Sequence, residues 1–324
     1  MGRGYKFSRR TLFHAWLASL GHLWAGTSRL DTELDPVGFA LQGFTPSVTF
    51  QRRYRMDATI LLLGAPVFTR QAAGGGYASV EIARDQGATA VALQFAAGSS
   101  PVRAHGLNRF GILREAVVGR GGATELSFAG LMTRSREESF EQGRKALVSS
   151  PSRAECVVAR GRTSGSAIET WIDTADATPD CNWTNLNETL RAALRHEPQT
   201  PHRETDSGAT TTFLHAMRSA ALCRDPVVRG RFMHAGKLYW LETHRHPQRS
   251  SEFSEELDGA IHNLSGARCA EFRTAYSTGD ESGIPIRIEY RPRSFLRLTF
   301  EAERDATQPV IPSVFPTAFP EENV

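Results

Sequence analysis

The chain has 324 residues, 40% of them hydrophobic, which is enough to bury a sizeable core in one or two domains. Its formal net charge at neutral pH is only +3, so the composition gives no reason to expect a nucleic-acid partner.

The N-terminus contains an export-like signal. The residues Ser8-Arg9-Arg10-Thr11-Leu12-Phe13 resemble the bacterial twin-arginine motif, and a moderately apolar run follows over residues 15–25. Residues 1–26 are therefore predicted to be a twin-arginine-type signal segment of a periplasmic or cell-envelope protein of a bacterium. The alternative is an amphipathic N-terminal helix. The run is too short and too interrupted for a permanent membrane span.

Export would place the four cysteines in an oxidising compartment, where one or two disulfides could form. No C-x-x-C spacing occurs, so neither a zinc knuckle nor a thioredoxin-like pair is indicated. Independent buried thiols are the alternative. The pairing is left open among Cys156, Cys181, Cys223 and Cys269.

A first meander of strands is expected between residues 48 and 132. Apolar and polar residues alternate along residues 48–63, until Gly64 and Pro66 end the run. The run Gly74-Gly75-Gly76 opens no helix and is interpreted as a flexible turn between strands. The further predicted strands cover residues 67–68, 77–82, 89–95, 112–118 and 125–132.

A mixed segment over residues 135–227 follows this meander. Helices are predicted over residues 135–148, 183–195 and 211–222, and a strand over residues 167–172. The polar stretch 196–208 is predicted to be a loop.

The second predicted meander, residues 230–301, has six short strands and the clearest alternation in the chain. A hairpin is expected over residues 230–244, and an antiparallel pair over residues 257–276. Ile286, Ile288 and Tyr290 then fall on one face, while the intervening charged residues fall on the other. One dry face and one wet face indicate an antiparallel sheet covered on one side.

These elements predict an α+β fold that is predominantly β, with a curved antiparallel meander sheet, half-barrel-like, partly wrapped around a few helices. Residues 40–304 are expected to form a single domain. The proline-containing tail, residues 305–324, is expected to be extended and to lie along the sheet.

The strand rhythm, the export-like start and the stretch Ile284-Pro285-Ile286-Arg287-Ile288-Glu289-Tyr290 together resemble uncharacterised exported bacterial proteins. Those families have a half-barrel sheet like that of the lipoprotein-carrier superfamily. The resemblance covers the C-terminal third and part of residues 48–132, and it includes no catalytic motif. It implies a concave apolar face able to hold an acyl chain or another hydrophobic partner. Candidate ligand-binding residues on the predicted strands are Tyr54, Trp240 and Tyr290.

One group of residues suggests a metal-dependent enzyme instead. G-x-S-x-G, the phosphate-binding G-x-x-x-x-G-K-[ST] and H-E-x-x-H are all absent. Glu242, His244 and His246 recur at a period of two, and His262 lies on the next predicted strand. A carboxylate with imidazoles is a sensible ligand set for a divalent metal such as zinc or iron. The alternative is that these are solvated residues where a strand ends.

The arginines of the last two strands raise a similar choice. Arg287, Arg291, Arg293 and Arg297 could meet anionic lipid headgroups in a peripheral membrane contact, but Glu289 and Glu301 lie among them. A self-neutralised sheet surface is the favoured interpretation.

Three functions remain open from the sequence. The first is an exported, non-catalytic binding protein that holds an apolar small molecule, a lipid or an apolar partner on a concave sheet. The second is a metal-dependent enzyme centred on Glu242, His244 and His246. The third is an envelope structural or assembly component that uses a sheet edge or the C-terminal tail.

Overall fold

A computed structural model describes residues 34–85, 87–104, 109–133, 155–164, 167–176, 183–196, 201–204, 211–234, 237–246, 254–303 and 313–315. The first eight strands are β1 Val48–Leu62, β2 Ala65–Asp85, β3 Ala88–Ser99, β4 Phe110–Arg120, β5 Ala123–Thr133, β6 Glu155–Ser164, β7 Ala167–Asp176 and β8 Pro201–Glu204. The other six are β9 Val227–His234, β10 Lys237–Arg245, β11 Ser254–Asn263, β12 Arg268–Ser277, β13 Arg287–Arg293 and β14 Leu296–Ala302. The described helices are α2 Pro36–Ala40, α4 Leu186–Leu194 and α5 Phe213–Leu222.

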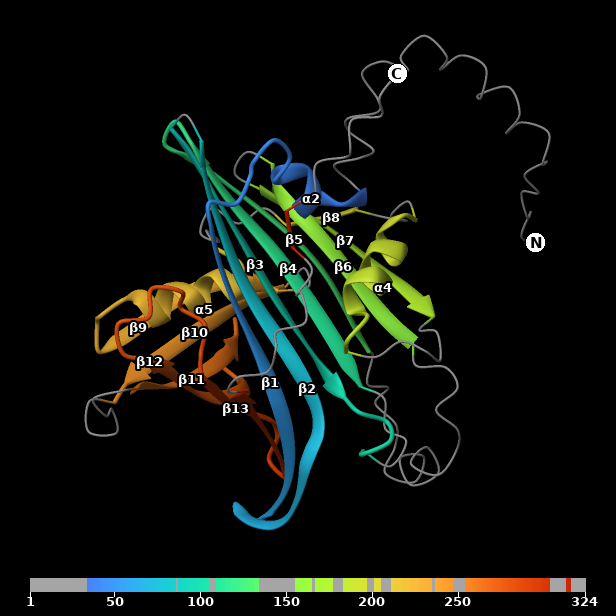
Figure 1. Cartoon of the computed structure of the whole chain (residues 1–324), viewed down its shortest axis with the longest axis vertical. Coiled ribbons are helices and arrows are strands. Elements are labelled where there is room, and N and C mark those ends of the chain that lie inside the picture. Colours follow the sequence, from blue (N-terminus) through green and yellow to red (C-terminus); the bar gives the residue numbers. More distant parts are fainter. Residues whose placement is uncertain are drawn as a thin grey trace, which may run out of the picture.

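All fourteen strands belong to one antiparallel sheet with the order β8-β7-β6-β5-β4-β3-β2-β1-β14-β13-β12-β11-β10-β9 (Figure 1). Each meander is a run of neighbouring strands, and the two meanders join where β1 pairs with β14. The predicted, predominantly β fold with a curved antiparallel sheet is confirmed. No helix in the described part of the chain is long and apolar enough to cross a membrane.

The outer face of the first meander carries the larger core. Alternate residues of β2 to β6 meet α2, α4 and residues 313–315 there. The three buried leucines of α4, at positions 186, 190 and 194, follow helical spacing and supply one apolar stripe. Within the C-terminal tail, the described residues 313–315 lie against the sheet, and Val314 and Phe315 are buried in this core.

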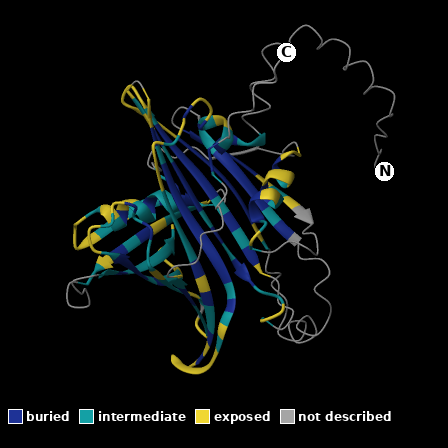
Figure 2. Cartoon of the chain, in the orientation of Figure 1, coloured by how far each residue is buried: buried dark blue, intermediate teal, exposed yellow. Residues whose placement is uncertain are grey.

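The sheet curls so that its inner face encloses α5. Ala216 and Ala220 of α5 pack on Phe232, Leu241 and Phe272 of the second meander. The curl also brings Met233 of β9 into a cluster with side chains of β5, β6 and β7. In Figure 2 the strands of the first meander are mostly dark blue, whereas those of the second meander are largely teal.

Buried charged side chains connect α2 and residues 313–315 to the sheet through hydrogen bonds. Glu81 of β2 accepts hydrogen bonds from the Ser313 hydroxyl, at 2.7 Å, and from the backbone N–H groups of Val314 and Phe315, at 3.0 and 3.3 Å. Arg114 of β4 donates to Asp35, at 3.3 Å, and Asp35 in turn caps α2. Buried charges need such partners, because an unpaired one would carry a large desolvation cost.

Several predicted boundaries were wrong. Gly74-Gly75-Gly76 is not a turn but the middle of the 21-residue strand β2. The expected loop 196–208 contains β8, and β6 was not predicted at all. The packed part of the chain also begins before residue 40, since Val37 of α2 is fully buried.

Other predictions fall on parts of the chain that the structure does not describe. The signal segment 1–26 and the helix 135–148 lie outside the described residues. Among the described cysteines, Cys156, Cys223 and Cys269 form no disulfide, and Cys156 is buried.

The glycines of β2 give the first testable prediction. A Cβ on Gly74 would lie 2.0 Å from the carbonyl oxygen of Gly98 and 2.8 Å from the Ser99 Cα, both of which are backbone atoms. Gly74→Ala is therefore expected to lower the free energy of unfolding by about 1–3 kcal/mol, which is the usual cost of overpacking. Gly119→Ala in β4 is the matched control, because its nearest atom would be 3.9 Å away. Equal losses in urea unfolding for the two variants would contradict the steric explanation.

Candidate functional site

The inner face of β1 forms one apolar stripe that runs from the core to the solvent. The stripe contains Tyr54, Met56, Ala58, Ile60 and Leu62, which alternate along the strand. Tyr54 and Met56 are only 1% and 5% exposed, whereas Ile60 is 42% and Leu62 is 65% exposed. The apolar surface is therefore buried at one end and open at the other.

Neighbouring strands widen this stripe. Ala58 pairs with Leu298 of β14, and Leu298 pairs with Tyr290 of β13. Directly paired residues share one face of a sheet, so these three form a row across the inner face. Ile60 makes the next row with Leu296 and with Phe68 of β2. The described inner face thus offers a three- to four-strand apolar surface beside the open end.

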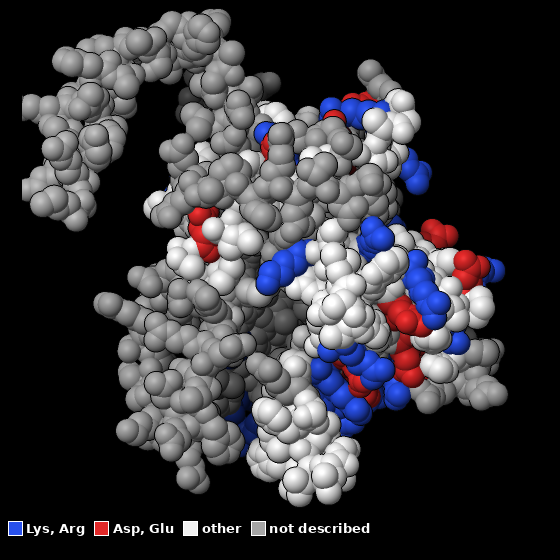
Figure 3. Space-filling view, turned by 180° about the vertical axis from the view of Figure 1, so that it is seen from behind, with Lys and Arg blue, Asp and Glu red and all other residues white. Residues whose placement is uncertain are grey.

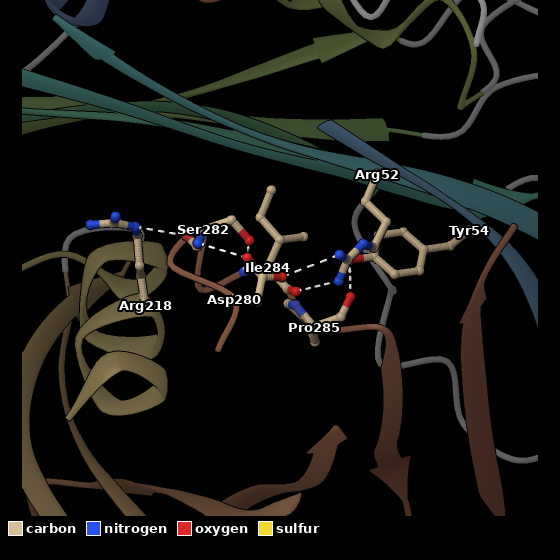
Figure 4. Close-up of polar contacts among 7 residues, drawn as sticks. All are labelled: Arg52, Tyr54, Arg218, Asp280, Ser282, Ile284 and Pro285. Carbon is tan, nitrogen blue, oxygen red and sulfur yellow. Dashed lines mark hydrogen bonds and ion pairs between the residues drawn. The ribbon is translucent and has the colours of Figure 1, made fainter. Parts of the chain in front are cut away.

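The closed end is sealed by the segment between β12 and β13 (Figure 4). The Tyr54 hydroxyl donates to the Pro285 carbonyl at 2.6 Å, and its ring lies against Phe95 and Phe300. Burial raises the pKa of Tyr54 far above its usual value, so the phenol stays protonated and remains a donor.

Two arginines hold the same segment from opposite sides (Figure 4). Arg52 of β1 donates to the Ile284 carbonyl at 2.5 Å and pairs with Asp280 at 3.2 Å. Arg218 of α5 donates to the Ser282 carbonyl at 2.9 Å. The segment therefore ties β1 to α5 across the inner face.

A buried carboxylate holds the N-terminus of α5. Glu115 of β4 accepts from the Thr212 hydroxyl at 2.5 Å and from the backbone N–H groups of Leu214 and His215 at 3.0 and 2.9 Å. Burial raises the pKa of Glu115 to about 7, although these hydrogen bonds act in the opposite direction. A negative charge at a helix N-terminus also interacts favourably with the helix dipole.

Arg245 holds the C-terminal end of α5. Arg245 of β10 donates to the carbonyls of Ala221 and Cys223, at 3.1 and 2.5 Å, and pairs with Glu255. The last carbonyls of a helix lack partners within the helix, so the guanidinium satisfies them. Polar contacts to strands thus fix both ends of the helix that covers the inner face.

The predicted ligand-binding residues are split between two faces. Tyr54 and Tyr290 both lie on the inner face, Tyr54 at its closed end and Tyr290 in the row nearer the open end. Trp240 lies on the outer face of β10, 37% exposed, with the Arg231 guanidinium 4.8 Å from its ring centroid. The structure therefore does not bring Trp240 together with the other two, because Trp240 lies on the face of β10 opposite to the buried Leu241 and Thr243.

The predicted metal ligands are dispersed over the outer face of β10 and β11. His244 Nε2 lies 3.0 Å from the Glu242 carboxylate, which also pairs with Arg229 at 2.7 Å. The hydrogen bond from Arg229 and that from His244 lower the pKa of Glu242. His246 lies just beyond β10 and its Nε2 is 3.0 Å from Asp258 instead.

His262 does not complete the set. Its Nδ1 lies 3.3 Å from the Gly266 carbonyl oxygen, and its strand register places it opposite Trp240. A shallow depression of about 410 Å³ is lined by Glu242, His244 and His262, by three arginines, and by three further acidic residues, namely Arg268, Arg273, Arg291, Asp258, Glu271 and Glu289. Within the described ranges, no group of three or more His, Cys, Asp or Glu side chains has the arrangement of a metal site.

The outer face of the last strands is a network of ion pairs. Arg287 pairs with Glu289 at 2.7 Å and with Glu301 at 3.9 Å, and Arg273 pairs with Asp258 at 2.6 Å. Of the four arginines considered for a membrane contact, Arg287 is neutralised in this way, whereas Arg297 forms no ion pair with a described carboxylate. Such exposed pairs contribute little to stability.

Comparison with known proteins does not assign the chain to a family. No known protein family matches the chain, and no curated protein or solved structure matches it either.

The charged residues that anchor α5, α2 and residues 313–315 to the sheet were not predicted from the sequence. Arg114 and Glu115 stand side by side inside an otherwise apolar strand, and adjacent strand residues point to opposite faces. A charged residue in such a run requires a buried partner on its own face. That signal was present for Glu115 and for Glu81, although the partners could not be named from it.

Proposed function

We propose that this chain is an exported, non-catalytic binding protein that holds an apolar, lipid-like ligand on the inner face of its curled sheet. The observation that carries the proposal is the apolar stripe of β1, which continues from buried Tyr54 to the exposed Leu62. An acyl chain laid along the open half would replace water at Ala58, Leu298 and Tyr290. Burial of apolar surface is the driving force for such binding.

The covering elements support the same proposal. One helix and one loop close the inner face, and both are fixed to the sheet by hydrogen bonds and ion pairs that can form and break. Sliding of α5 or of residues 277–286 would lengthen the accessible apolar surface towards Tyr54. No chemical step is needed in this function.

Native mass spectrometry of the full chain, purified without detergent, tests the proposal. We expect an excess mass that dissociates as a lipid or another apolar molecule on denaturation. A bare polypeptide that also fails to bind the apolar dye N-phenyl-1-naphthylamine would overturn the proposal. A tightly held metal without an organic ligand would favour the enzyme centred on the outer face.

A pair of variants locates the ligand. Leu298→Glu places a charge in the middle of the inner apolar surface and is expected to weaken dye binding by about tenfold or more, because a carboxylate resists desolvation. Arg291→Glu on β13 changes an exposed outer residue and is the matched control, expected to retain wild-type affinity. Thermal unfolding of both variants verifies that they are folded. Equal weakening in both would place the ligand elsewhere.

A further inference from the structure

The end of the sheet where the β1–β2 hairpin turns carries a concentration of exposed apolar side chains. Leu63 is fully exposed, and Leu62, Val67 and Phe68 of the same hairpin are each more than half exposed. We define the apolar tip as the following exposed residues: Ile60, Leu62, Leu63, Val67, Phe68, Val102 and Phe295. The hairpin projects at the lower end of Figure 1 and is yellow, the colour of exposed residues, in Figure 2.

Three separate segments meet at this tip, so it is a built surface and not one frayed loop. The backbone N–H of Leu61 donates to the Phe295 carbonyl, in the β13–β14 turn, at 2.8 Å. The Arg70 Nε donates to the Arg103 carbonyl at 2.8 Å, which fixes the β3–β4 segment beside β2. A hollow of about 380 Å³ lies there, lined by Phe68, Arg70 and Arg103 together with Thr69 and Gln71.

The turn itself holds a leucine in an unfavourable conformation. Leu63 has φ of 50° and Gly64 has φ of 85°, which is the left-handed region at both central positions of the turn. Asn, Asp or Gly would normally occupy the first of these positions. A fully exposed leucine in a strained turn contributes nothing to the core, and strained residues of this kind are found at functional sites.

Within the three segments that form the tip, all charged side chains are basic. The segments 58–71, 100–104 and 291–298 contain five arginines and no Asp or Glu. Arg70, Arg103 and Arg297 form no ion pair with a described carboxylate, in contrast to the paired arginines farther along the outer face. In Figure 3 the projecting lower end is white, with blue side chains beside it.

We propose that the apolar tip docks on an anionic lipid bilayer, with its leucines and Phe68 in the acyl boundary and Arg70, Arg103 and Arg297 at the depth of the phosphates. A projecting apolar apex with a basic collar has the complementarity of a membrane interface, where apolar side chains enter the headgroup boundary and cations meet anionic lipids. A flat protein partner would not bury side chains that point to several sides of a projecting turn. The inference stands on the tip alone, and holds whether or not the inner face carries a ligand.

Vesicle cosedimentation of the full chain tests this inference. We expect the wild type to sediment with vesicles of phosphatidylcholine that contain about 30 mol% phosphatidylglycerol. Sedimentation is expected to be weaker with pure phosphatidylcholine vesicles, and weaker at high salt concentration. The double variant Leu62→Glu/Leu63→Glu is expected to lose about tenfold or more in binding, because charges resist entry into the acyl boundary. Arg70→Gln/Arg103→Gln is expected to lose the preference for anionic vesicles.

The matched control is Leu264→Glu, at the β11–β12 turn, where an exposed leucine is separated from the β1–β2 hairpin by β14 and β13 in the sheet. It is expected to bind vesicles as the wild type does. A wild type that stays in the supernatant, or an equal loss in Leu264→Glu, would overturn the inference. A wild-type dimer in light scattering that becomes a monomer in Leu62→Glu/Leu63→Glu, without vesicle binding by either, would assign the tip to a second copy of the chain. None of these outcomes depends on the mass-spectrometric test of a bound ligand.

Discussion

Arg160→Met is expected to destabilise the fold by about 3–5 kcal/mol, the usual cost of removing one partner of a buried ion pair. Arg160 is 1% exposed on the outer face of β6. Its guanidinium donates to the carbonyls of Leu34, Leu194 and His196, at 3.0, 3.1 and 2.9 Å, and to Asp173 at 2.9 Å. Methionine would fill most of the volume but would leave Asp173 without its arginine and three carbonyls without this donor.

Arg162→Met is the matched control for Arg160→Met. Arg162 lies two residues along the same strand and the same face, but it is more exposed. It lies 3.6 Å from Glu169 and stacks over Trp171 at 5.9 Å. Its replacement is expected to cost less than about 1 kcal/mol. Urea unfolding measures both variants, and similar midpoints would show that the four contacts of Arg160 do not stabilise the fold.

The second meander could be predicted because its two faces differ in chemistry. Ile288 and Tyr290 turn inward and Arg287 and Glu289 turn outward, so the period of two is visible without knowledge of the partners. The strand β8 could not be found in this way. It is a four-residue edge strand, Pro201–Glu204, that pairs with β7 through backbone groups and shows no apolar alternation.

The glycines of the long strand β2 were interpreted incorrectly from the sequence alone. Its glycines were interpreted as a break, although their role is to make room for neighbours. A Cβ on Gly75 would lie 2.6 Å from the Trp183 ring, and one on Gly74 would meet the backbone of β3. Close approach and a flexible turn both require glycine, and only the packing partner distinguishes them.

The candidate site was predictable in part for the same reasons. The alternation along β1 identifies the inner stripe, including Tyr54, directly from the sequence. The position of α5 over the inner face could not be inferred, because it depends on contacts between residues about a hundred positions apart, such as Glu115 with Thr212. Sequence periodicity describes the face on which a residue lies but carries no information about the segment that packs on it.

Glu115→Gln is expected to remove a pH dependence of stability that the wild type shows. The folded protein holds this carboxyl with a pKa of about 7, against a usual value of 4.5. Between these two pH values the folded state binds a proton that the unfolded state does not, so stability falls as pH rises from about 4.5 to about 7. A shift of this size corresponds to about 3 kcal/mol in all. Glutamine cannot ionise, so its variant lacks this contribution.

Two histidines near α5 act in the opposite direction. Burial lowers the pKa of His215 and of His234, so both contribute stability that is lost as pH falls below their usual 6.5. They are present in both proteins, and the difference between wild type and Glu115→Gln therefore isolates the carboxylate. Chemical unfolding at pH 4.5, 6 and 8 is expected to show this difference shifting against the wild type as pH rises.

Glu242→Gln provides the contrast for Glu115→Gln. Glu242 lies on the outer face, where the hydrogen bond from Arg229 lowers its pKa, so its contribution is lost as pH falls and has the opposite sign. A Glu115→Gln variant that keeps the full wild-type pH dependence would show that this carboxyl does not titrate near neutrality. If the dependence disappears as expected, the ionisation of Glu115, which contacts the N-terminus of α5, is linked to folding near neutral pH.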